Sequence, residues 1–198
     1  MVDRRESGVP GRRGPAPSLT QVEIVSAALR VLDRAGAQDF SMRALATELG
    51  VSAMTVYNYL PTKALLLEKT VDSVIDPIRP PDPDAHPWDA ELRRYALDAW
   101  RAQLPHPWIP ALLSAHGLDE RPAQARAREA LLGLFQAAGA GEAAARDGVT
   151  FFFTFMIGSF AQLTPAVTRH SAAHRDALFE RGLQIMTAGL RSHLGLRD

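Results

Sequence analysis

Apolar residues recur every three to four positions through most of the chain, the spacing of helices that bury one face. The first such segment begins at Thr20, a hydroxyl residue followed three positions later by Glu23, which is the pattern of a capping box. Gly36 offers a left-handed stop, so a helix is expected between these points. Its predicted inward stripe consists of Val25, Ala28, Leu29 and Leu32.

Hydroxyl residues mark the starts of three further helices, at Ser41, Ser52 and Thr62. Gly50 is expected to end the first of these, and the third is expected to run to Ile75. The first two helices would share a core made of Leu45, Leu49, Val51, Val56 and Leu60.

Helical spacing returns in the second half of the chain, over 88–104, 109–116, 123–138, 142–163 and 172–194. No segment alternates strictly between apolar and polar residues, and β-branched residues are sparse, so the predicted fold class is all-α. The proline-rich segment 77–87 is expected to connect two domains, 19–76 and 88–198. Residues 1–18, rich in Pro, Gly and Arg, are expected to form a flexible arm.

Composition narrows the function classes. The 198 residues carry no net charge and no cysteine, which excludes disulfides, thiolate nucleophiles and cysteine metal sites. Residues 1–70 hold nine Lys or Arg against seven Asp or Glu, an asymmetry that favours a local phosphate-facing patch over a generally basic protein. The most apolar run, 149–163, is shorter than a membrane span. Neither a secretory segment nor a membrane partner is expected, and the predicted localisation is cytoplasmic.

The stretch from Ser41 to Lys63 has the spacing of a helix-turn-helix. Ala46 is small where two helices would cross, and Gly50 can adopt a positive φ in the turn. With Val56 and Leu60 turned inward, the polar side of the helix that begins at Ser52 is expected to project Ala53, Thr55 and Asn58 into a DNA major groove. The alternative is an ordinary helical core in which Tyr57 packs against the first helix.

The quoted stretch "FSMRALATELGVSAMTVYNYLPTKALLLE", together with the helix before it, resembles the DNA-binding domain of the tetracycline-repressor family of bacterial regulators. The resemblance implies DNA contacts from the hydroxyl that opens the second helix, from the third helix and from the lysine that opens the fourth. Carried over by position, these residues are Ser41, Arg43, Ser52, Ala53, Met54, Thr55, Tyr57, Asn58, Tyr59 and Lys63. Ala53, Met54 and Asn58 depart from the residues expected there, so the resemblance does not carry over an operator sequence. Arg4, Arg5, Arg12 and Arg13 form either a minor-groove arm or a solvated tail.

The segment "PWDAELRRYALDAWRAQLPHPW" resembles the start of the regulatory domain in the tetracycline-repressor branch of that family. By this resemblance, the second domain would hold a small-molecule effector pocket and a dimer interface. The positions that would coordinate tetracycline and its magnesium are not reproduced, because Tyr95 and Ala99 occupy the helix face where a polar and an aromatic ligand contact would be expected. Neither tetracycline nor a bound metal is therefore inferred. The candidate pocket residues are Tyr95, Trp100, Gln103, Leu104, Trp108, Leu112, His116, Phe152, Phe155 and Met156, apt for a flat apolar molecule.

The segments 142–163 and 172–194 are apolar around more than one face. Two such helices from each of two chains would form a four-helix seam, and a symmetric dimer places paired recognition helices on a palindromic duplex. Gly158, Ser159 and Ala161 would let a partner helix approach closely. The alternative is a monomeric core.

Two other functions remain open. One is a regulator that acts through protein contacts without an effector, and the other is an all-helical enzyme. For the enzyme, His170 and His174 have the spacing of a helical metal pair but lack a third ligand, and His106 is expected to pack on Trp108 in a loop. No catalytic residue, metal site or cofactor is therefore predicted. The predicted function is a DNA-binding transcriptional regulator, a repressor released by a small effector.

Overall fold

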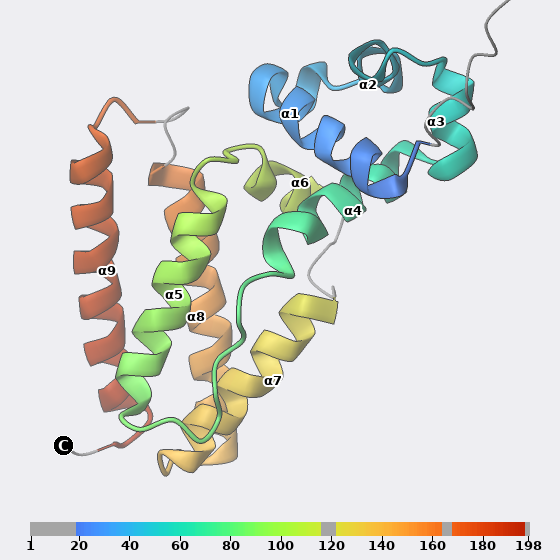
Figure 1. The fold of residues 1–198 in the computed structure, drawn as a ribbon. Coiled ribbons are helices and arrows are strands. Elements are labelled where there is room, and N and C mark those ends of the chain that lie inside the picture. The colour runs from blue at the N-terminus through green and yellow to red at the C-terminus, as the bar shows by residue number, and fades with distance from the viewer. Residues whose placement is uncertain (1–18, 116–121, 164–167, 197–198) are drawn as a thin grey trace, which may run out of the picture.

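The computed structural model describes residues 19–115, 122–163 and 168–196, and this part of the chain contains helices and no strands. The all-α prediction is confirmed. The helices are α1 (Gln21–Asp39), α2 (Met42–Leu49), α3 (Ala53–Tyr59), α4 (Lys63–Ile75), α5 (Trp88–Gln103), α6 (Ile109–Ala115), α7 (Pro122–Ala137), α8 (Glu142–Leu163) and α9 (Ala172–His193). Helices α1 to α4 gather at one end of the molecule, while α5, α8 and α9 run side by side and α7 lies against α8 (Figure 1).

Side-chain caps define the starts of the first helices. The Glu23 amide donates to the Thr20 hydroxyl at 3.2 Å, and the Thr20 amide donates to the Glu23 carboxylate at 2.8 Å, so the predicted capping box is present. The predicted stop is only a break: Gly36 has φ 78°, and helical residues continue beyond it to Asp39. At the other end of α4, the predicted limit at Ile75 is confirmed.

The core of the N-terminal unit, here called the first core, is centred on α1. Its buried α1 residues are Ile24, Ala27, Ala28, Val31 and Leu32. Val25 and Leu29, which were placed in the inward stripe, are only half-buried. The stripe prediction was therefore about one residue off in phase, because α2 and α4 both pack on α1 and draw a wider face inward.

The first core also includes residues that follow the predicted domain boundary. Trp108, Ile109, Leu112 and Leu113, from the start and body of α6, are buried in it together with residues of α1 to α4. Helix α6 therefore packs in the first core, although its residues follow the predicted boundary. The division into 19–76 and 88–198 stays a prediction.

The proline-rich connection is tied to α5 by one carboxylate. Glu91, whose side chain is 9% exposed, accepts hydrogen bonds from the Asp82 amide at 2.8 Å and from Arg94 Nη2 at 2.7 Å. Arg94 Nη2 also donates to the carbonyl oxygens of Arg79 and Pro80. The hydrogen bonds from Arg94 are the main reason that the pKa of Glu91 lies below its usual range, and burial opposes them.

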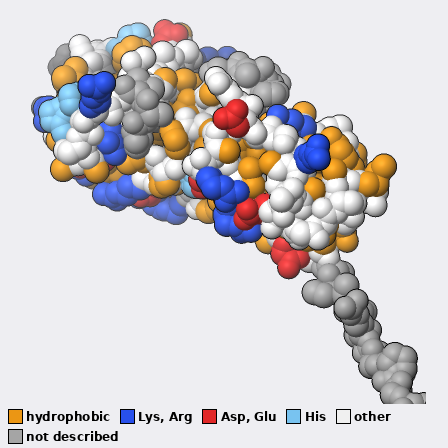
Figure 2. Space-filling view, turned by 90° about the horizontal axis from the view of Figure 1, so that it is seen from above, with side chains coloured by type: hydrophobic (Ala, Val, Ile, Leu, Met, Phe, Trp, Pro, Cys, Tyr) orange, Lys and Arg blue, Asp and Glu red, His pale blue; other side chains and the backbone are white. Residues whose placement is uncertain are grey.

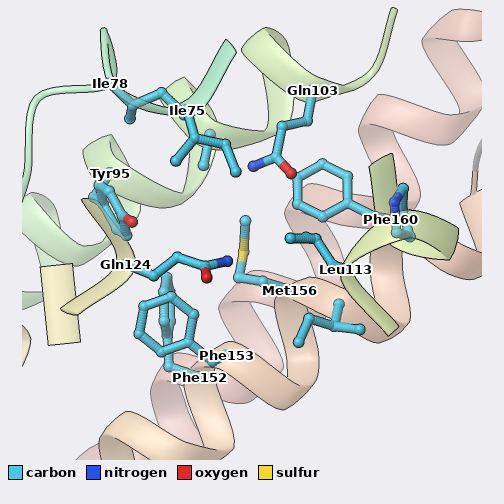
Figure 3. Close-up of a pocket in the computed structure, with 13 residues that line it drawn as sticks. Ile75, Ile78, Tyr95, Gln103, Leu113, Gln124, Phe152, Phe153, Met156 and Phe160 are labelled. Carbon is cyan, nitrogen blue, oxygen red and sulfur yellow. The ribbon is translucent and has the colours of Figure 1, made fainter. Parts of the chain in front are cut away.

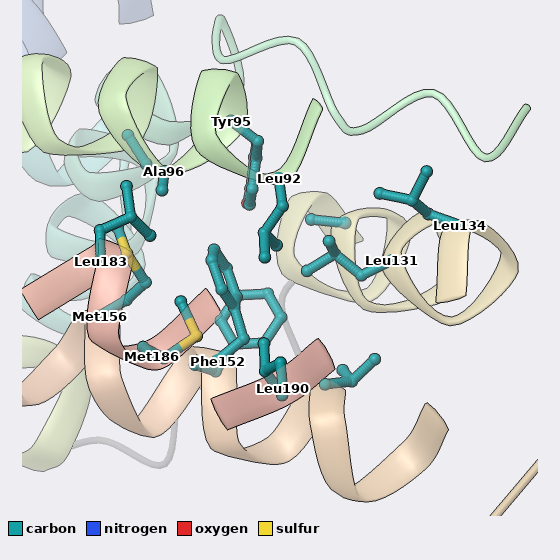
Figure 4. Packing of buried hydrophobic residues seen from close by; sticks show 14 of the residues in the cluster. Leu92, Tyr95, Ala96, Leu131, Leu134, Phe152, Met156, Leu183, Met186 and Leu190 are labelled. Carbon is teal, nitrogen blue, oxygen red and sulfur yellow. The ribbon is translucent and has the colours of Figure 1, made fainter. Parts of the chain in front are cut away.

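The second core fills the space between α5, α7, α8 and α9 (Figure 4). Leu92, Phe152 and Leu183 come from three different helices and are almost completely buried in it. Trp100 stacks on Phe179 with ring centroids 4.3 Å apart. None of the helices in the described ranges is long and apolar enough to cross a membrane.

Candidate nucleic-acid interface and cavity

Two caps and a glycine fix the geometry of α2 and α3. The Ser41 hydroxyl accepts from the Ala44 amide at 3.1 Å, and the Ser52 hydroxyl accepts from the Thr55 amide at 3.1 Å. Gly50 ends α2 in the left-handed conformation, with φ 66°. A residue with a Cβ would be strained there, so the turn that sets α3 against α2 depends on this glycine.

Helix α3 has one buried and one open side. Val56 is 0% exposed and Leu60, just after the helix, is 1% exposed. On the open side, Met54 is 70% exposed and Tyr57 is 39% exposed, and Asn58 is exposed beside them. The helix therefore presents an amide, a phenol and a thioether to solvent.

Two residues of α3 lie elsewhere than expected. Ala53 and Thr55 were predicted to project with Asn58, but both are half-buried, and Ala53 packs against the first core. At about 100° per residue, Ala53 lies only about 60° from Val56 on the helical wheel, so the same packing that buries Val56 covers it. Met54, two residues before Val56, lies on the opposite side of the helix and is exposed.

The remaining predicted contact residues differ in exposure and in the hydrogen bonds that they already make within the protein. The Thr55 hydroxyl lies 2.9 Å from the Ser52 hydroxyl, so both are already engaged in the cap. Tyr59 is half-buried against the first core, and its carbonyl accepts from Gln21 Nε2 at 3.1 Å. Arg43 is exposed on α2.

Lys63 opens α4 and is held in place there. Its ammonium donates to the Phe40 carbonyl oxygen at 2.7 Å and lies 5.5 Å from the centre of the Phe40 ring. An ammonium has three donors, and the side chain is exposed, so donors remain for an anion at this helix start.

Seen from above, the molecule shows basic side chains scattered among hydrophobic and uncharged ones (Figure 2). On α1, Arg30 and Arg34 are paired with Glu48 of α2 at 3.1 and 3.0 Å. These hydrogen bonds, that from Arg34 first, hold the pKa of Glu48 below its ordinary value. The two arginines thus join α1 to α2.

A partly open cavity of about 40 Å³ lies where the helices of the first core meet those of the second core (Figure 3). The wall is mostly apolar and comes from the end of α4 and from α5, α6, α7 and α8. It consists of Ile75, Ile78, Tyr95, Ala99, Gln103, Pro110, Leu113, Gln124, Phe152, Phe153, Met156, Ile157 and Phe160.

Four predicted pocket residues line this cavity: Tyr95, Gln103, Phe152 and Met156. The expectation that all the candidates share one cavity is wrong. Trp100 and Phe155 both contact Phe179 on the α9 side of the second core. Leu104 packs at the edge of that core, next to a surface hollow that Trp100 also lines.

Trp108 and Leu112 were also placed in the pocket, but both are buried in the first core. Trp108 Nε1 donates to Asp33 of α1 at 2.7 Å, which directs the indole away from the cavity. The predicted contact of His106 with Trp108 is confirmed, with ring centroids 5.8 Å apart. His116 lies outside the described residues.

The polar groups of the cavity are uncharged. Gln103 is 9% exposed, and the amide oxygen of Gln124 has no hydrogen-bond partner within the described part of the chain. Burial raises the pKa of Tyr95 to about 12, so its phenol is neutral at physiological pH. An unpaired buried acceptor favours a ligand with a hydrogen-bond donor.

Several lining residues are not among the residues predicted for the pocket. Phe153 and Phe160 follow the helical spacing of Phe152 and Met156, so that face of α8 could have been extended from its period. Ile75 and Ile78 come from the end of α4 and the connection, and only the tertiary fold brings them to α8. Gln124 of α7 is likewise brought to the cavity wall only by the tertiary fold.

One face of α8 and α9 remains open in the single chain. Phe151 is 55% exposed and Ile185 is 75% exposed. Between these helices lies a groove of about 360 Å³ lined by Asp147, Gly148, Phe151, Gly189, Leu190 and His193. A Cβ placed on Gly158 or Gly189 would meet no atom within 4 Å, so another helix has room to approach.

The imidazoles of His170 and His174 lie 4.4 Å apart between ring centroids and are exposed. Among the described residues, no three His, Cys, Asp or Glu side chains are grouped so as to hold a metal ion.

Residues 24–70 match the model of a family described as bacterial regulatory proteins, tetR family. The chain is 31% identical over 210 residues to an HTH-type transcriptional regulator of Saccharopolyspora erythraea, covering 91% of this chain and 88% of the relative.

Solved structures share the fold. BioQ with its double-stranded DNA operator superposes with a TM-score of 0.72 at 25% identity, covering 89% of this chain and 100% of BioQ. A TetR variant from Acinetobacter baumannii in complex with minocycline superposes with a TM-score of 0.76 at 20% identity, covering 89% of this chain and 99% of that chain.

Proposed function

The chain belongs to the tetR family of bacterial regulatory proteins, and we propose that it is a homodimeric repressor whose hold on DNA is released by a small molecule. It acts in the cytoplasm, where the chromosomal duplex is found. Its function is binding rather than turnover, since the family consists of transcriptional regulators.

The observation that carries the DNA-binding part is the open side of α3. An exposed helix that presents Asn58, Met54 and Tyr57 beside a buried Val56 is shaped to enter a major groove. The Asn58 amide can pair with an adenine edge, and the Met54 thioether can meet a thymine methyl group.

Phosphate contacts would flank these base contacts. Lys63 has ammonium donors to spare at the start of α4, and Arg43 and Tyr57 are exposed beside the groove-facing side. Ser41 and Ser52 act mainly by capping α2 and α3, which aims the helix amides outward. Ala53, Thr55 and Tyr59 then support the geometry of α3.

A dimer is proposed through α8 and α9. Phe151 and Ile185 leave a large apolar area exposed in the single chain, and the small residues beside them permit close helix packing. An isologous interface of this kind pairs two recognition helices for a palindromic operator.

The effector is proposed to enter the cavity between the first and second cores. The wall includes Ile75 at the end of α4 and Ile78 in the connection that follows, and α4 begins with Lys63, the proposed phosphate contact. A ligand that fits only after this wall has moved binds one arrangement of the helices better than the other. It therefore lowers the affinity for DNA if that arrangement binds DNA less well. The lining favours an uncharged, flat and mostly apolar molecule with a donor for Gln124.

The volume of about 40 Å³ also favours the second candidate, a regulator that needs no effector. Drug-sized ligands occupy pockets of about 300–1,000 Å³, so an effector must widen this cavity. Thermal melts against a panel of neutral aromatic compounds separate the two candidates: an effector raises the melting temperature, whereas no response across the panel favours the ligand-independent regulator.

The DNA-binding proposal is tested by selecting duplexes from a random pool with the purified protein. A palindromic consensus with half-sites about one helical turn apart is expected. Recovery of sequences without a consensus at low salt would contradict the proposal.

A further inference from the structure

One carboxylate joins α1 to the segment that leads into α6. Asp33 Oδ1 accepts from the indole Nε1 of Trp108 at 2.7 Å and lies 2.7 Å from His106 Nδ1. Trp108 is 4% exposed and the His106 side chain is 15% exposed. Hydrogen bonds to a charged acceptor at the edge of a core are among the stronger ones in proteins.

The same segment forms part of the cavity wall. Pro110 and Leu113 of α6 line the cavity, and α6 packs on α8, which supplies much of the remaining wall. Leu112 and Trp108, from the same short segment, are buried in the first core. Helix α6 therefore touches the cavity on one side and the DNA-facing unit on the other.

Helix α1 is the element on which that unit is assembled. It packs against both α2 and α4, and Gln21 near its start donates to the carbonyl oxygen of Tyr59 at the end of α3. Asp33 thus lies on a helix that contacts the elements presenting Asn58 and Lys63.

We propose that Asp33 is a positioning residue that couples the state of the cavity to the orientation of the DNA-binding helices, by holding Trp108 and His106 on α1. When the cavity widens and α6 moves, the bonds to Asp33 make α1 follow. Without them, α6 moves while α1 keeps its place. The inference rests on the proposed function and adds a second route beside the end of α4.

Coupling can be measured without knowing the effector. Ala99 lines the cavity and is 4% exposed, so Ala99→Leu forces the wall outward in the way that a ligand would. Affinity for the selected duplex is measured for this variant in the full-length wild-type, Asp33→Ala and Trp108→Phe backgrounds. In the wild-type background, Ala99→Leu is expected to lower the affinity about tenfold. In the other two backgrounds the loss should shrink to about threefold or less.

Trp108→Phe removes the indole donor and part of the ring volume but leaves Asp33 and its contact with His106 in place, so it keeps the test decisive where Asp33→Ala lowers the melting temperature too far. Val22→Ala is the matched control, because this side chain of the same helix as Asp33 is 74% exposed and belongs to neither the first core nor the cavity wall. It should leave the tenfold loss intact. An equal loss in all backgrounds, or no loss in the wild-type background, would overturn the coupling. A wild-type protein that binds no selected duplex would instead refute the proposed function, and the coupling with it.

Discussion

The ammonium of Lys63 donates a 2.7 Å hydrogen bond to the carbonyl oxygen of Phe40, which ties the start of α4 to the residue that precedes the cap of α2. The Phe40 ring is 2% exposed and lies 5.5 Å from the same ammonium. The proposed phosphate contact is thus aimed by a bond inside the protein. A lysine held in this way loses less side-chain entropy when DNA binds.

Lys63→Ala is expected to weaken binding to all duplexes alike and to reduce the slope of log affinity against log salt by about 1, because one phosphate contact is lost. Fluorescence anisotropy at several salt concentrations measures both. Lys69→Ala is the control, since it removes the same charge from an exposed site further along α4. An unchanged salt slope in Lys63→Ala would show that the residue serves only the Phe40 contact.

Asn58→Ala is expected to relax the preference for one base pair, at a cost of about 1–3 kcal/mol for the favoured base and little for the others. The side chain is exposed, so the melting temperature should stay close to that of the wild type. Repeating the selection from a random pool with the variant measures the change. A consensus identical to that of the wild type would remove Asn58 from base recognition.

The faces of α3 show how far a sequence pattern reaches. The caps, the glycine turn and the buried Val56 depend on neighbours within a few residues, and these predictions are confirmed. Helical geometry alone already placed Met54 opposite Val56 and Ala53 near it, so the error at Ala53 was one of phase. Which side chains touch DNA stays a prediction.

The cavity shows where a pattern stops being informative. Because α8 is apolar around most of its circumference, periodicity could not separate Phe152, which faces the cavity, from Phe155, which packs on Phe179. The placement of Trp108 depends on Asp33, which lies 75 residues earlier in the chain. Contacts of that range follow from the tertiary fold and leave no local signal.

Glu91→Gln is expected to destabilise the protein at neutral pH by about 1–3 kcal/mol, because a carboxylate that accepts from Arg94 and from the Asp82 amide loses its charge. The pKa of Glu91 is lowered in the folded state, so its contribution is present above the unfolded value of about 4.3 and is lost as the pH falls through the folded pKa. The difference between variant and wild type should therefore shrink in acid.

Urea denaturation at neutral pH and at about pH 3.5 measures this difference. Glu142→Gln is the control, since its pair with Arg146 is 67% exposed on both sides and should contribute less than about 1 kcal/mol at any pH. A penalty for Glu91→Gln that does not change with pH would indicate that the carboxylate acts by shape and not by charge.

Ile185→Arg tests the proposed dimer face. Ile185 is 75% exposed in the single chain, so a charged replacement costs little within one subunit but places two like charges across a symmetric seam. Light scattering is expected to give the mass of one chain, 21.6 kDa, for the variant and twice that mass for the wild type. Affinity for the palindromic duplex should fall towards that for a half-site, because each subunit then binds alone.

Gln184→Arg adds the same charge at the neighbouring residue, which lies against a hollow on the α5 side. It should remain dimeric, so a loss of dimer in Ile185→Arg alone locates the interface on the side of α9 that Phe151 of α8 shares. If both variants keep twice the mass of one chain, the open face is not the seam. Paired recognition would then need another surface to set the spacing of the two copies of α3.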